Sequence, residues 1–347
     1  MYYYSRLLYV GVFMKALVAI KQNKTFDTFF SKDNIALAES LGETVWLDTA
    51  SATEQELKEK IKDCDTYITC WGSPALTAEI LDCAPKLKLL THLGSTVAPV
   101  VCDEVYERGI KVISGFDYYS KSTAEGAVAY MLAALRDIPF YTDRLKKSKI
   151  WRESDDYTDG LLYKSVGLVG FGGVGRYVAK MLSGFEVDVK VYDIAQISDE
   201  DKKAYNITQC GIEEIFENCD IISLHLPYND STYHMVDDAL ISKIKRGALL
   251  VNTARGAVID EQALVKHLEN GDFNAALDVY EKEPIDMDSV LLSLDNVLLL
   301  PHQAGPTVNL RAVITKKLLI ESADYIDKNI PLKNEILAEK AKNMSKF

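Results

Sequence analysis

The sequence lacks an excess of positive charge. Lys and Arg number 39 against 51 Asp and Glu, which gives a formal net charge of −12. A nucleic-acid partner requires a basic face, so this balance argues against one. An anionic small molecule stays compatible with the chain, because a single Arg or a helix N-terminus can locally outweigh the global charge.

The sequence also lacks paired cysteines. Its six cysteines form no C-x-x-C pair and no Cys/His cluster with metal-ligand spacing. We therefore expect no metal site, and free thiols in a reducing compartment, which points to a cytoplasmic protein.

Long apolar runs are missing outside the N-terminus, so no membrane association is expected. Two interpretations of residues 1–13 stay open. Residues 7–13 resemble the apolar core of a signal peptide, but Lys15 interrupts the run and no small-residue cleavage site is clear. We favour an extra leader before a buried strand.

What the 347 residues do contain is alternating strand-like and helix-like patterns without internal repeats. Strands are expected near 15–20, 44–47, 66–70, 88–92 and 110–114, and again at 221–227, 248–253, 275–279 and 297–300. A long apolar helix is expected over 122–147, between two bodies. Short strands separated by helices predict an α/β fold with two doubly wound parallel sheets.

A glycine-rich turn lies near the middle of the chain. Gly170, Gly172 and Gly175 have the G-x-G-x-x-G spacing between a strand-like and a helix-like run, and the following strand ends at Asp193. Such a turn lets a pyrophosphate approach a helix N-terminus, and the Asp can accept hydrogen bonds from ribose hydroxyls. No Arg follows Asp193 to hold a 2′-phosphate, which favours NAD over NADP. A tight turn without a ligand is the alternative.

Polar residues gather a second time between 252 and 305, at or just beyond expected strand ends. Arg255 lies in Asn-Thr-Ala-Arg-Gly, Asp278 and Glu283 lie in Asp-Val-Tyr-Glu-Lys-Glu-Pro, and His302 lies in Pro-His-Gln-Ala-Gly. Strand ends of an open α/β sheet face the ligand crevice.

With these motifs, the sequence resembles the D-isomer-specific 2-hydroxyacid dehydrogenases, over nearly everything from residue 14 to about 328. The resemblance implies a Rossmann NAD-binding domain at 118–302, including the long helix, inserted into a flavodoxin-like substrate domain made of 14–117 and 303–335. It implies NAD as cofactor, a small 2-keto or 2-hydroxy carboxylate as substrate, and a homodimer formed through the long helix and its following loop. It also implies that the regulatory domain of longer phosphoglycerate dehydrogenases is lacking.

The family's catalytic roles fall on Arg255, Glu283 and His302. Arg255 can hold a 2-keto acid with its planar donor fork, and His302 can exchange a proton with the carbonyl oxygen. Glu283 would orient His302 and favour its protonated form. Separately, each residue has a bland alternative as a surface, turn or structural residue.

The resemblance assigns further residues to ligands. Substrate-binding residues are expected to be Gly94, Ser95, Thr96 and Arg255. The sequence of the 94–96 loop differs from that of common family members, and an ordinary turn that caps a helix is the alternative. Cofactor-binding residues are expected to be Gly170, Gly172, Gly173, Val174, Gly175, Asp193, Pro227, Thr232, Thr253, Asp278 and Gly305. His225 is expected to line the cofactor side or to pack in the sheet. An NAD-sensing, corepressor-like binding protein on the same fold is the alternative function.

Overall fold

The computed structural model describes residues 14–345. Both interpretations of the N-terminal 13 residues therefore fall outside the described residues. By its contacts the chain divides into two units, Met1–Tyr119 with Pro306–Phe347, and Ser120–Gly305. The chain passes into the second unit after Tyr119, two residues beyond the expected boundary at 117. It returns to the first unit after Gly305, three residues beyond the expected boundary at 302. Along residues 14–345, no helix has the length and apolar character needed to cross a membrane.

The first unit is built on a five-stranded parallel sheet with the strand order β2-β1-β3-β4-β5. This is the flavodoxin-like order. Its strands are β1 Met14–Ala19, β2 Gly42–Leu47, β3 Thr66–Thr69, β4 Leu89–His92 and β5 Lys111–Ser114. Its helices are α1 Lys24–Phe29, α2 Lys32–Ser40, α3 Glu54–Ile61, α4 Ala78–Asp82, α5 Asp103–Glu107, α13 Val308–Lys328 and α14 Ala338–Lys342.

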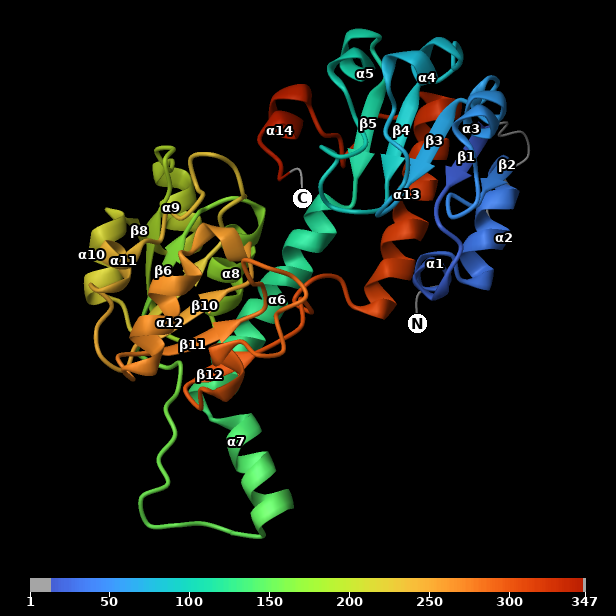
Figure 1. Ribbon diagram of the computed structural model, residues 1–347. Coiled ribbons are helices and arrows are strands. Elements are labelled where there is room, and N and C mark those ends of the chain that lie inside the picture. Colours follow the sequence, from blue (N-terminus) through green and yellow to red (C-terminus); the bar gives the residue numbers. More distant parts are fainter. Residues whose placement is uncertain (1–13, 346–347) are drawn as a thin grey trace, which may run out of the picture. The chain divides into compact units, whose positions relative to one another are not determined.

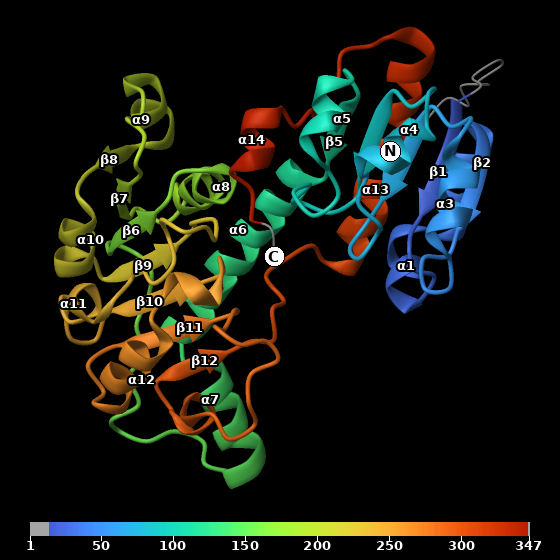
Figure 2. The ribbon, with the colours of Figure 1, turned by 45° about the horizontal axis from the view of Figure 1, so that its top comes forward.

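Helices cover both faces of this sheet, and each face has its own apolar core (Figures 1 and 2). One core includes Leu57 and Ile80 from α3 and α4, and the other includes Ile314 and Leu318 from α13. Because both faces are covered, the inner strands β3 and β4 are buried along their whole length rather than at alternate residues. Residues beyond the expected limit at 335 also belong to this unit, since Ile336 and Ala341 join the first core.

The second unit contains a seven-stranded parallel sheet with the order β12-β11-β10-β9-β6-β7-β8. Without the edge strand β12, the six remaining strands lie in the order β8-β7-β6-β9-β10-β11, which is the Rossmann order 3-2-1-4-5-6. The strands are β6 Ser165–Val169, β7 Asp188–Tyr192, β8 Ile207–Gln209, β9 Ile221–Leu224, β10 Leu249–Asn252, β11 Asn274–Leu277 and β12 Val297–Leu299. The helices are α6 Phe116–Leu135, which begins in the first unit, α7 Ile138–Asp143, α8 Gly173–Leu182, α9 Asp199–Tyr205, α10 Ile212–Asn218, α11 Asp238–Ile241 and α12 Glu261–Glu269. The two doubly wound parallel sheets confirm the predicted fold class.

The predicted continuous helix over 122–147 is wrong. The helix α6 starts earlier, at Phe116, and ends at Leu135. Asp137 then adopts a left-handed conformation with φ of +47° before α7, and Pro139 lies in the first turn of α7. Since proline has no N–H with which to continue the hydrogen bonding of α6, but is tolerated in a first turn, the break belongs there. A π-helical turn, Arg144–Ser148, follows, and the segment projects from the second unit (Figure 1).

Candidate active site

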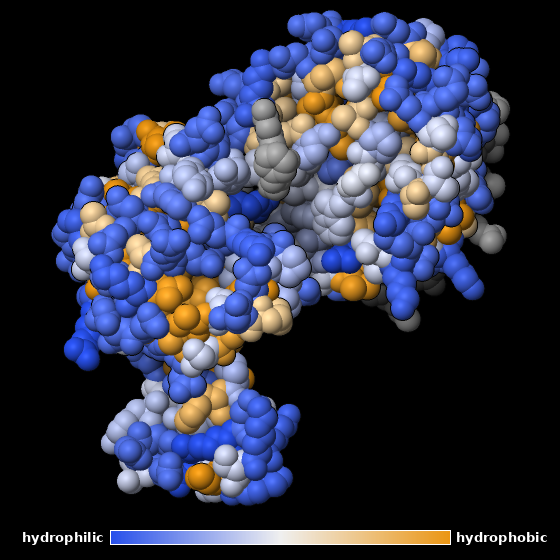
Figure 3. Space-filling model, viewed as in Figure 1, coloured by the Kyte–Doolittle hydropathy of each residue, from blue (hydrophilic) through white to orange (hydrophobic). Residues whose placement is uncertain are grey.

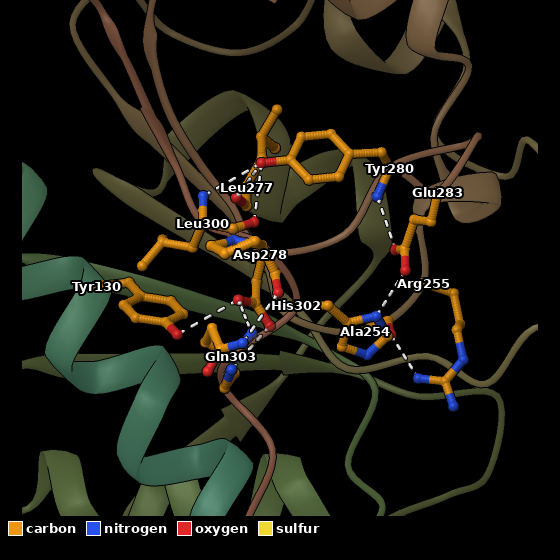
Figure 4. A network of polar contacts seen from close by, with 12 residues as sticks. Tyr130, Ala254, Arg255, Leu277, Asp278, Tyr280, Glu283, Leu300, His302 and Gln303 are labelled. Carbon is orange, nitrogen blue, oxygen red and sulfur yellow. Dashed lines mark hydrogen bonds and ion pairs between the residues drawn. The ribbon is translucent and has the colours of Figure 1, made fainter. Parts of the chain in front are cut away.

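His302 and Glu283 lie in contact at the carboxyl edge of the second sheet. Nδ1 of His302 lies 2.7 Å from Oε2 of Glu283, whose other carboxylate oxygen accepts a 3.2 Å hydrogen bond from the Tyr280 amide (Figure 4). No hydrogen bond within residues 14–345 uses Nε2 of the imidazole. Both side chains are partly exposed, at 49% for His302 and 37% for Glu283, so a ligand can reach the pair.

Arg255 is presented by a loop that its own neighbours hold in shape. The amide side chain of Asn252, at the end of β10, donates to the Arg255 carbonyl at 3.0 Å and accepts from the Ala254 N–H at 3.0 Å. Arg255 Nη1 donates to the Ala254 carbonyl at 2.7 Å. Burial lowers the pKa of Arg255, and the Glu283 carboxylate opposes this shift. The guanidinium is therefore a preorganised, partly desolvated cation beside an acidic group.

The next residue, Gly256, allows the loop that carries Arg255 to pack directly against the backbone of Tyr280 and Glu281. A Cβ there would lie 1.9 Å from the carbonyl carbon of Tyr280, far closer than two non-bonded carbon atoms can approach. No larger residue fits without displacing the segment that carries Glu283. Tyr280 in turn donates from its hydroxyl to the Leu300 carbonyl at 2.9 Å, which ties the ends of β11 and β12 together.

Asp278 fixes the backbone that carries His302. Its buried carboxylate accepts hydrogen bonds from the Gln303 N–H at 2.6 Å, the Ala304 N–H at 2.9 Å and the Tyr130 hydroxyl at 3.3 Å (Figure 4). Its backbone carbonyl accepts from the His302 N–H at 2.9 Å. His302 adopts φ of +54°, a conformation uncommon outside glycine. These hydrogen bonds offset the cost of holding His302 in that conformation.

The glycine turn forms the N-terminus of α8. Gly170 has φ of +103°, and a Cβ at Gly175 would lie 2.2 Å from the Gly170 carbonyl oxygen. Gly172 is the N-cap of α8 and has no capping side chain, and nothing lies within 4 Å of where its Cβ would be. Gly173 and Val174 supply the next amides. The turn therefore offers free helical N–H groups beside open space, which suits an anionic group.

Asp193 follows β7 and braces this turn. Its carboxylate accepts from the Phe171 N–H at 2.7 Å and from the Ala195 N–H at 2.9 Å. A carboxylate has about four lone-pair sites, so acceptor capacity remains for ribose hydroxyls.

The predicted substrate loop, Gly94 to Thr96, follows β4 in the first unit. A Cβ at Gly94 would lie 2.3 Å from Nε2 of His92. The His92 side chain is buried beneath the loop, and its other ring nitrogen, Nδ1, lies 2.9 Å from Thr69 Oγ1 in a hydrogen bond. Glycine is therefore needed at position 94. Thr96 donates its hydroxyl to the carbonyl of Ser345 at 2.7 Å, so the C-terminal segment already uses that donor.

Comparisons with known proteins agree with these geometries. The family model for the D-isomer specific 2-hydroxyacid dehydrogenase, NAD binding domain, matches residues 128–304. A glyoxylate reductase of Korarchaeum cryptofilum is 33% identical over 273 residues, covering 77% of this chain and 81% of that protein. The hydroxypyruvate reductase of Thermotoga maritima is 34% identical over 280 residues, covering 80% and 88%. The chain belongs to the D-isomer specific 2-hydroxyacid dehydrogenases.

Solved structures show the same fold as this dehydrogenase. A glyoxylate reductase from Paecilomyes thermophila superposes with a TM-score of 0.77 at 24% identity, covering 94% of this chain and 99% of that one. An acyclic imino acid reductase in complex with NADPH and D-Arg superposes with a TM-score of 0.75 at 25% identity, covering 93% and 100%. The predicted family and the predicted nicotinamide dinucleotide cofactor are confirmed, and the dehydrogenase is an NAD-dependent oxidoreductase.

The second unit of the dehydrogenase fits that cofactor in its unpartnered polar atoms as well as in its glycine turn. Ser223 Oγ, Thr253 Oγ1 and both ring nitrogens of His225 are buried and have no hydrogen-bond partner within residues 14–345. All three residues lie at or just after the carboxyl ends of β9 and β10. Buried polar groups are normally paired, so a bound ligand would supply the missing partners.

The remaining predicted cofactor residues are engaged differently. Thr232 is buried and donates its hydroxyl to the Pro227 carbonyl at 2.7 Å, which closes the loop after β9. The Gly305 carbonyl accepts from the Ser122 hydroxyl of α6 at 3.1 Å. These contacts shape the edge of the cofactor side without exposing the Thr232 hydroxyl.

Sequence reasoning missed the supporting residues of the dehydrogenase. Asn252, Gly256, Tyr130 and Tyr280 were given no role, yet they hold Arg255, Glu283 and Asp278 in place. Asn252 and Gly256 lie within the Asn-Thr-Ala-Arg-Gly motif, where their positions beside Arg255 could have signalled this. Tyr130 carries no local signal, because it comes from α6, 148 residues before Asp278.

Proposed function

We propose that this chain interconverts a small 2-keto acid and its D-2-hydroxy acid with NAD(H), using Arg255, Glu283 and His302. The observation that carries this proposal is the 2.7 Å contact between His302 Nδ1 and Glu283 Oε2, beside the Arg255 loop at one sheet edge. The parallel-sheet edge supports a ligand site there. In this proposal the second unit is the cofactor domain and the first is the substrate domain.

Arg255 binds the substrate in this scheme. Its guanidinium holds the carboxylate and the adjacent carbonyl oxygen through parallel N–H donors. The partly desolvated setting strengthens that attraction relative to water. The cation also stabilises the negative charge that develops on the oxygen during reduction.

His302 moves the proton. Because Nδ1 faces Glu283, Nε2 is the nitrogen that can reach a ligand. The protonated imidazole donates from Nε2 to the carbonyl oxygen, and the neutral imidazole takes the proton back from the hydroxyl in oxidation. Glu283 orients the ring through its contact with Nδ1. NAD(H), when held by the second unit, would supply the hydride chemistry that accompanies this proton transfer.

Residues of the second unit would hold the cofactor. The amides at Gly172, Gly173 and Val174 would bind the pyrophosphate, and Asp193 would bind the adenosine ribose and disfavour a 2′-phosphate. Thr253 and His225 would meet the nicotinamide end through their unpartnered polar atoms. We place Asp278 as a positioning residue, because the chain's own donors occupy its carboxylate.

The substrate proposal rests on shared chemistry. The relatives are named for glyoxylate, hydroxypyruvate and 3-phosphoglycerate, which all have, or derive from, a carbonyl beside a carboxylate. Backbone N–H groups of Gly94, Ser95 and Thr96 would bind the carboxylate in the first unit.

We also propose that the second unit forms a homodimer through the segment 137–163. Trp151 and Tyr157 are 83% and 80% exposed there, and apolar side chains break the otherwise hydrophilic surface of the projecting segment (Figure 3). Further exposed apolar residues are Ile138, Phe140, Leu145, Ile150, Leu162 and Tyr163. Arg144 braces the segment internally, with Nη1 2.6 Å from Asp156 Oδ1. An exposed apolar surface of this kind fits a second copy of the chain, in line with the homodimer that the family resemblance implies.

The test is a panel of 2-keto acids with NADH and with NADPH, followed by chiral analysis of the product. We expect turnover with NADH, weaker turnover with NADPH, and D-hydroxy acid as product. Tight NADH binding without turnover of any keto acid would favour a cofactor-sensing protein instead. Sedimentation of the chain and of a Trp151→Ser variant tests the dimer, which the variant should weaken.

A further inference from the structure

The first unit contains a cluster of aromatic side chains around an arginine, and none of these residues belongs to a motif described above. Phe29 ends α1, Trp71 follows β3, Tyr119 lies in the first turn of α6, and Arg311 lies in the first turn of α13. The helix α1 lies beside the start of α13 (Figures 1 and 2). We call these four residues the Arg311 cluster.

The rings of the Arg311 cluster make edge contacts around Trp71. Its indole lies 5.4 Å from the Phe29 ring and 6.0 Å from the Tyr119 ring, with interplanar angles of 81° and 84°. The loop that carries Trp71 is fixed, because the Ser73 hydroxyl accepts from the Cys70 N–H and donates to the Ala19 carbonyl. Trp71 is nevertheless 45% exposed, so the packed rings open to a surface.

Arg311 lies over two of these rings. Its guanidinium carbon is 5.3 Å from the centre of the Trp71 ring and 5.7 Å from that of Phe29, within range of a cation–π attraction. Its hydrogen bonds go to the Pro306 carbonyl and to the Thr28 hydroxyl, which are both neutral. Within residues 14–345 it has no carboxylate partner. Most of its N–H donors are therefore available to an anion.

Tyr119 provides a second, independent sign of a ligand. The residue is only 7% exposed, and its hydroxyl has no hydrogen-bond partner within residues 14–345. Burial raises the pKa of Tyr119, while the charge of Arg311 lowers it, which places the phenol in the field of the guanidinium. An unpartnered buried hydroxyl is unfavourable, and a bound acceptor would supply the missing hydrogen bond.

The cluster also adjoins the proposed substrate loop. The Tyr119 ring lies 3.0 Å from the position of a Cβ on Gly115, and the Gly115 N–H donates to the Gly94 carbonyl at 2.9 Å. Trp71 and Gly94 each follow the carboxyl end of neighbouring strands, β3 and β4. A molecule held by the Gly94–Thr96 loop thus lies beside Tyr119 at the ligand-binding edge of the sheet.

We propose that Arg311, Trp71 and Tyr119 form a specificity subsite for an anionic group at the far end of the 2-keto acid. The guanidinium fork and the Tyr119 hydroxyl bind the oxygens of a second carboxylate or of a phosphate. The Trp71 ring covers the carbon chain between the two anionic ends, and the buried Phe29 ring packs against Trp71. This inference rests on the proposed function, since it names the substrate class of that same reaction.

The experiment compares kcat/KM for three 2-keto acids in the wild type and in variants. The substrates are 2-oxobutyrate with a neutral end, 2-oxoglutarate with a carboxylate end and 3-phosphohydroxypyruvate with a phosphate end. The wild type should prefer one of the two anionic substrates. Arg311→Met should lower kcat/KM for that substrate by ~10- to 100-fold and for 2-oxobutyrate by less than ~3-fold.

Two further variants separate recognition from folding. Tyr119→Phe keeps the ring and removes the hydroxyl, and should lower kcat/KM for the anionic substrate by ~3- to 10-fold. Lys317→Met removes an exposed positive charge from the same helix and should leave the ratio between substrates unchanged.

The possible outcomes distinguish failure of the subsite proposal from failure of the proposed dehydrogenase function. A wild type that prefers 2-oxobutyrate, or variants that lower activity equally on all three substrates, would overturn the subsite while leaving the dehydrogenase reaction in place. Absence of turnover on every 2-keto acid would instead overturn the proposed function. If Arg311→Met does not fold, the Tyr119→Phe ratio decides alone.

Discussion

His92 in the first unit and His225 in the second are both buried at the carboxyl ends of inner strands, yet their surroundings differ. His92 has a partner in Thr69 Oγ1 at 2.9 Å, whereas neither ring nitrogen of His225 has one within residues 14–345. Burial lowers both pKa values, to about 4 for His92 and about 3 for His225. The first imidazole is thus a satisfied structural group beneath Gly94, and the second leaves acceptor and donor capacity for a ligand.

At the residues proposed for chemistry and for recognition, this contrast between the two units is reversed. In the second unit the residues proposed for chemistry are bound to one another, as His302 is to Glu283 and as Asp278 is to the backbone of the following loop. In the first unit Arg311 and Tyr119 retain unused hydrogen-bonding groups. A reaction site needs side chains that are held in place, whereas a recognition site needs hydrogen-bonding groups that are still unused. In this protein the second unit has the former and the first unit has the latter.

The largest expected effect comes from removing the proton donor. His302→Ala should lower kcat by ~10²–10⁴-fold, because no other group described here has a free imidazole nitrogen beside Glu283. The affinity for NADH should change little, since the glycine turn is intact. Steady-state kinetics and fluorescence titration with NADH measure the two quantities. Near-wild-type turnover would remove His302 from its proposed role.

A second prediction tests His92 as a structural group. Folding holds His92 neutral with a pKa of about 4, whereas the unfolded chain takes up a proton near pH 6.5. The stabilisation is therefore complete above pH 6.5 and is lost as the pH falls towards 4. Between pH 7 and pH 5 this residue should account for about 2 kcal/mol of lost stability.

The measurement can be confined to the first unit. Trp46 and Trp71 lie there and Trp151 lies in the second unit, so a Trp151→Phe background makes tryptophan fluorescence report on the first unit alone. Urea unfolding at pH 7 and pH 5 is then compared with the same experiment on His92→Gln. The expected result is a pH dependence about 2 kcal/mol smaller in the variant. An identical pH dependence in both would show that the imidazole is not held neutral.

A third prediction concerns cofactor choice in the second unit. Asp193→Ala should lower the preference for NADH over NADPH by roughly 10-fold, because the repulsion of a 2′-phosphate is removed. NADH binding should also weaken, since Asp193 braces the glycine turn through Phe171 and Ala195. Asp193→Asn, with the same shape and no charge, separates the two effects. An unchanged ratio of kcat/KM values would place the ribose contact elsewhere.

All five strands of the first unit were predicted from the sequence, and the turn motifs of the second unit could be predicted for a physical reason. Gly170 to Gly175 and Asn252 to Gly256 are short runs in which spacing alone encodes the turn, so their geometry is readable locally. The break at Asp137 was missed because the apolar pattern continues across it. The short strand β8, Ile207–Gln209, was also missed, as three residues give no periodicity.

The Arg311 cluster could not be read from the sequence. Its members are separated by dozens to hundreds of residues, and only the winding of the chain around the five-stranded sheet brings them together. Asp278 illustrates a different limit, because the resemblance assigns it to the cofactor without indicating its contacts within the chain. Its carboxylate accepts hydrogen bonds from two backbone amides and from the Tyr130 hydroxyl, and Tyr130 lies too far away in the sequence for this contact to be predicted.

The smallest expected effect tests the substrate loop of the first unit against its structural alternative. Thr96→Val keeps the shape of the side chain and removes the hydroxyl that reaches the Ser345 carbonyl. The variant should lose about 0.5–1.5 kcal/mol of stability, because one partly buried hydrogen bond is broken. Its KM for a 2-keto acid should change by less than ~2-fold, since backbone amides rather than this hydroxyl are proposed to bind the carboxylate. Ser95→Ala is the matched control, as it shortens the neighbouring side chain without touching that bond. Unchanged stability with a KM raised ~10-fold would reverse the assignment and make the Thr96 hydroxyl a direct substrate contact.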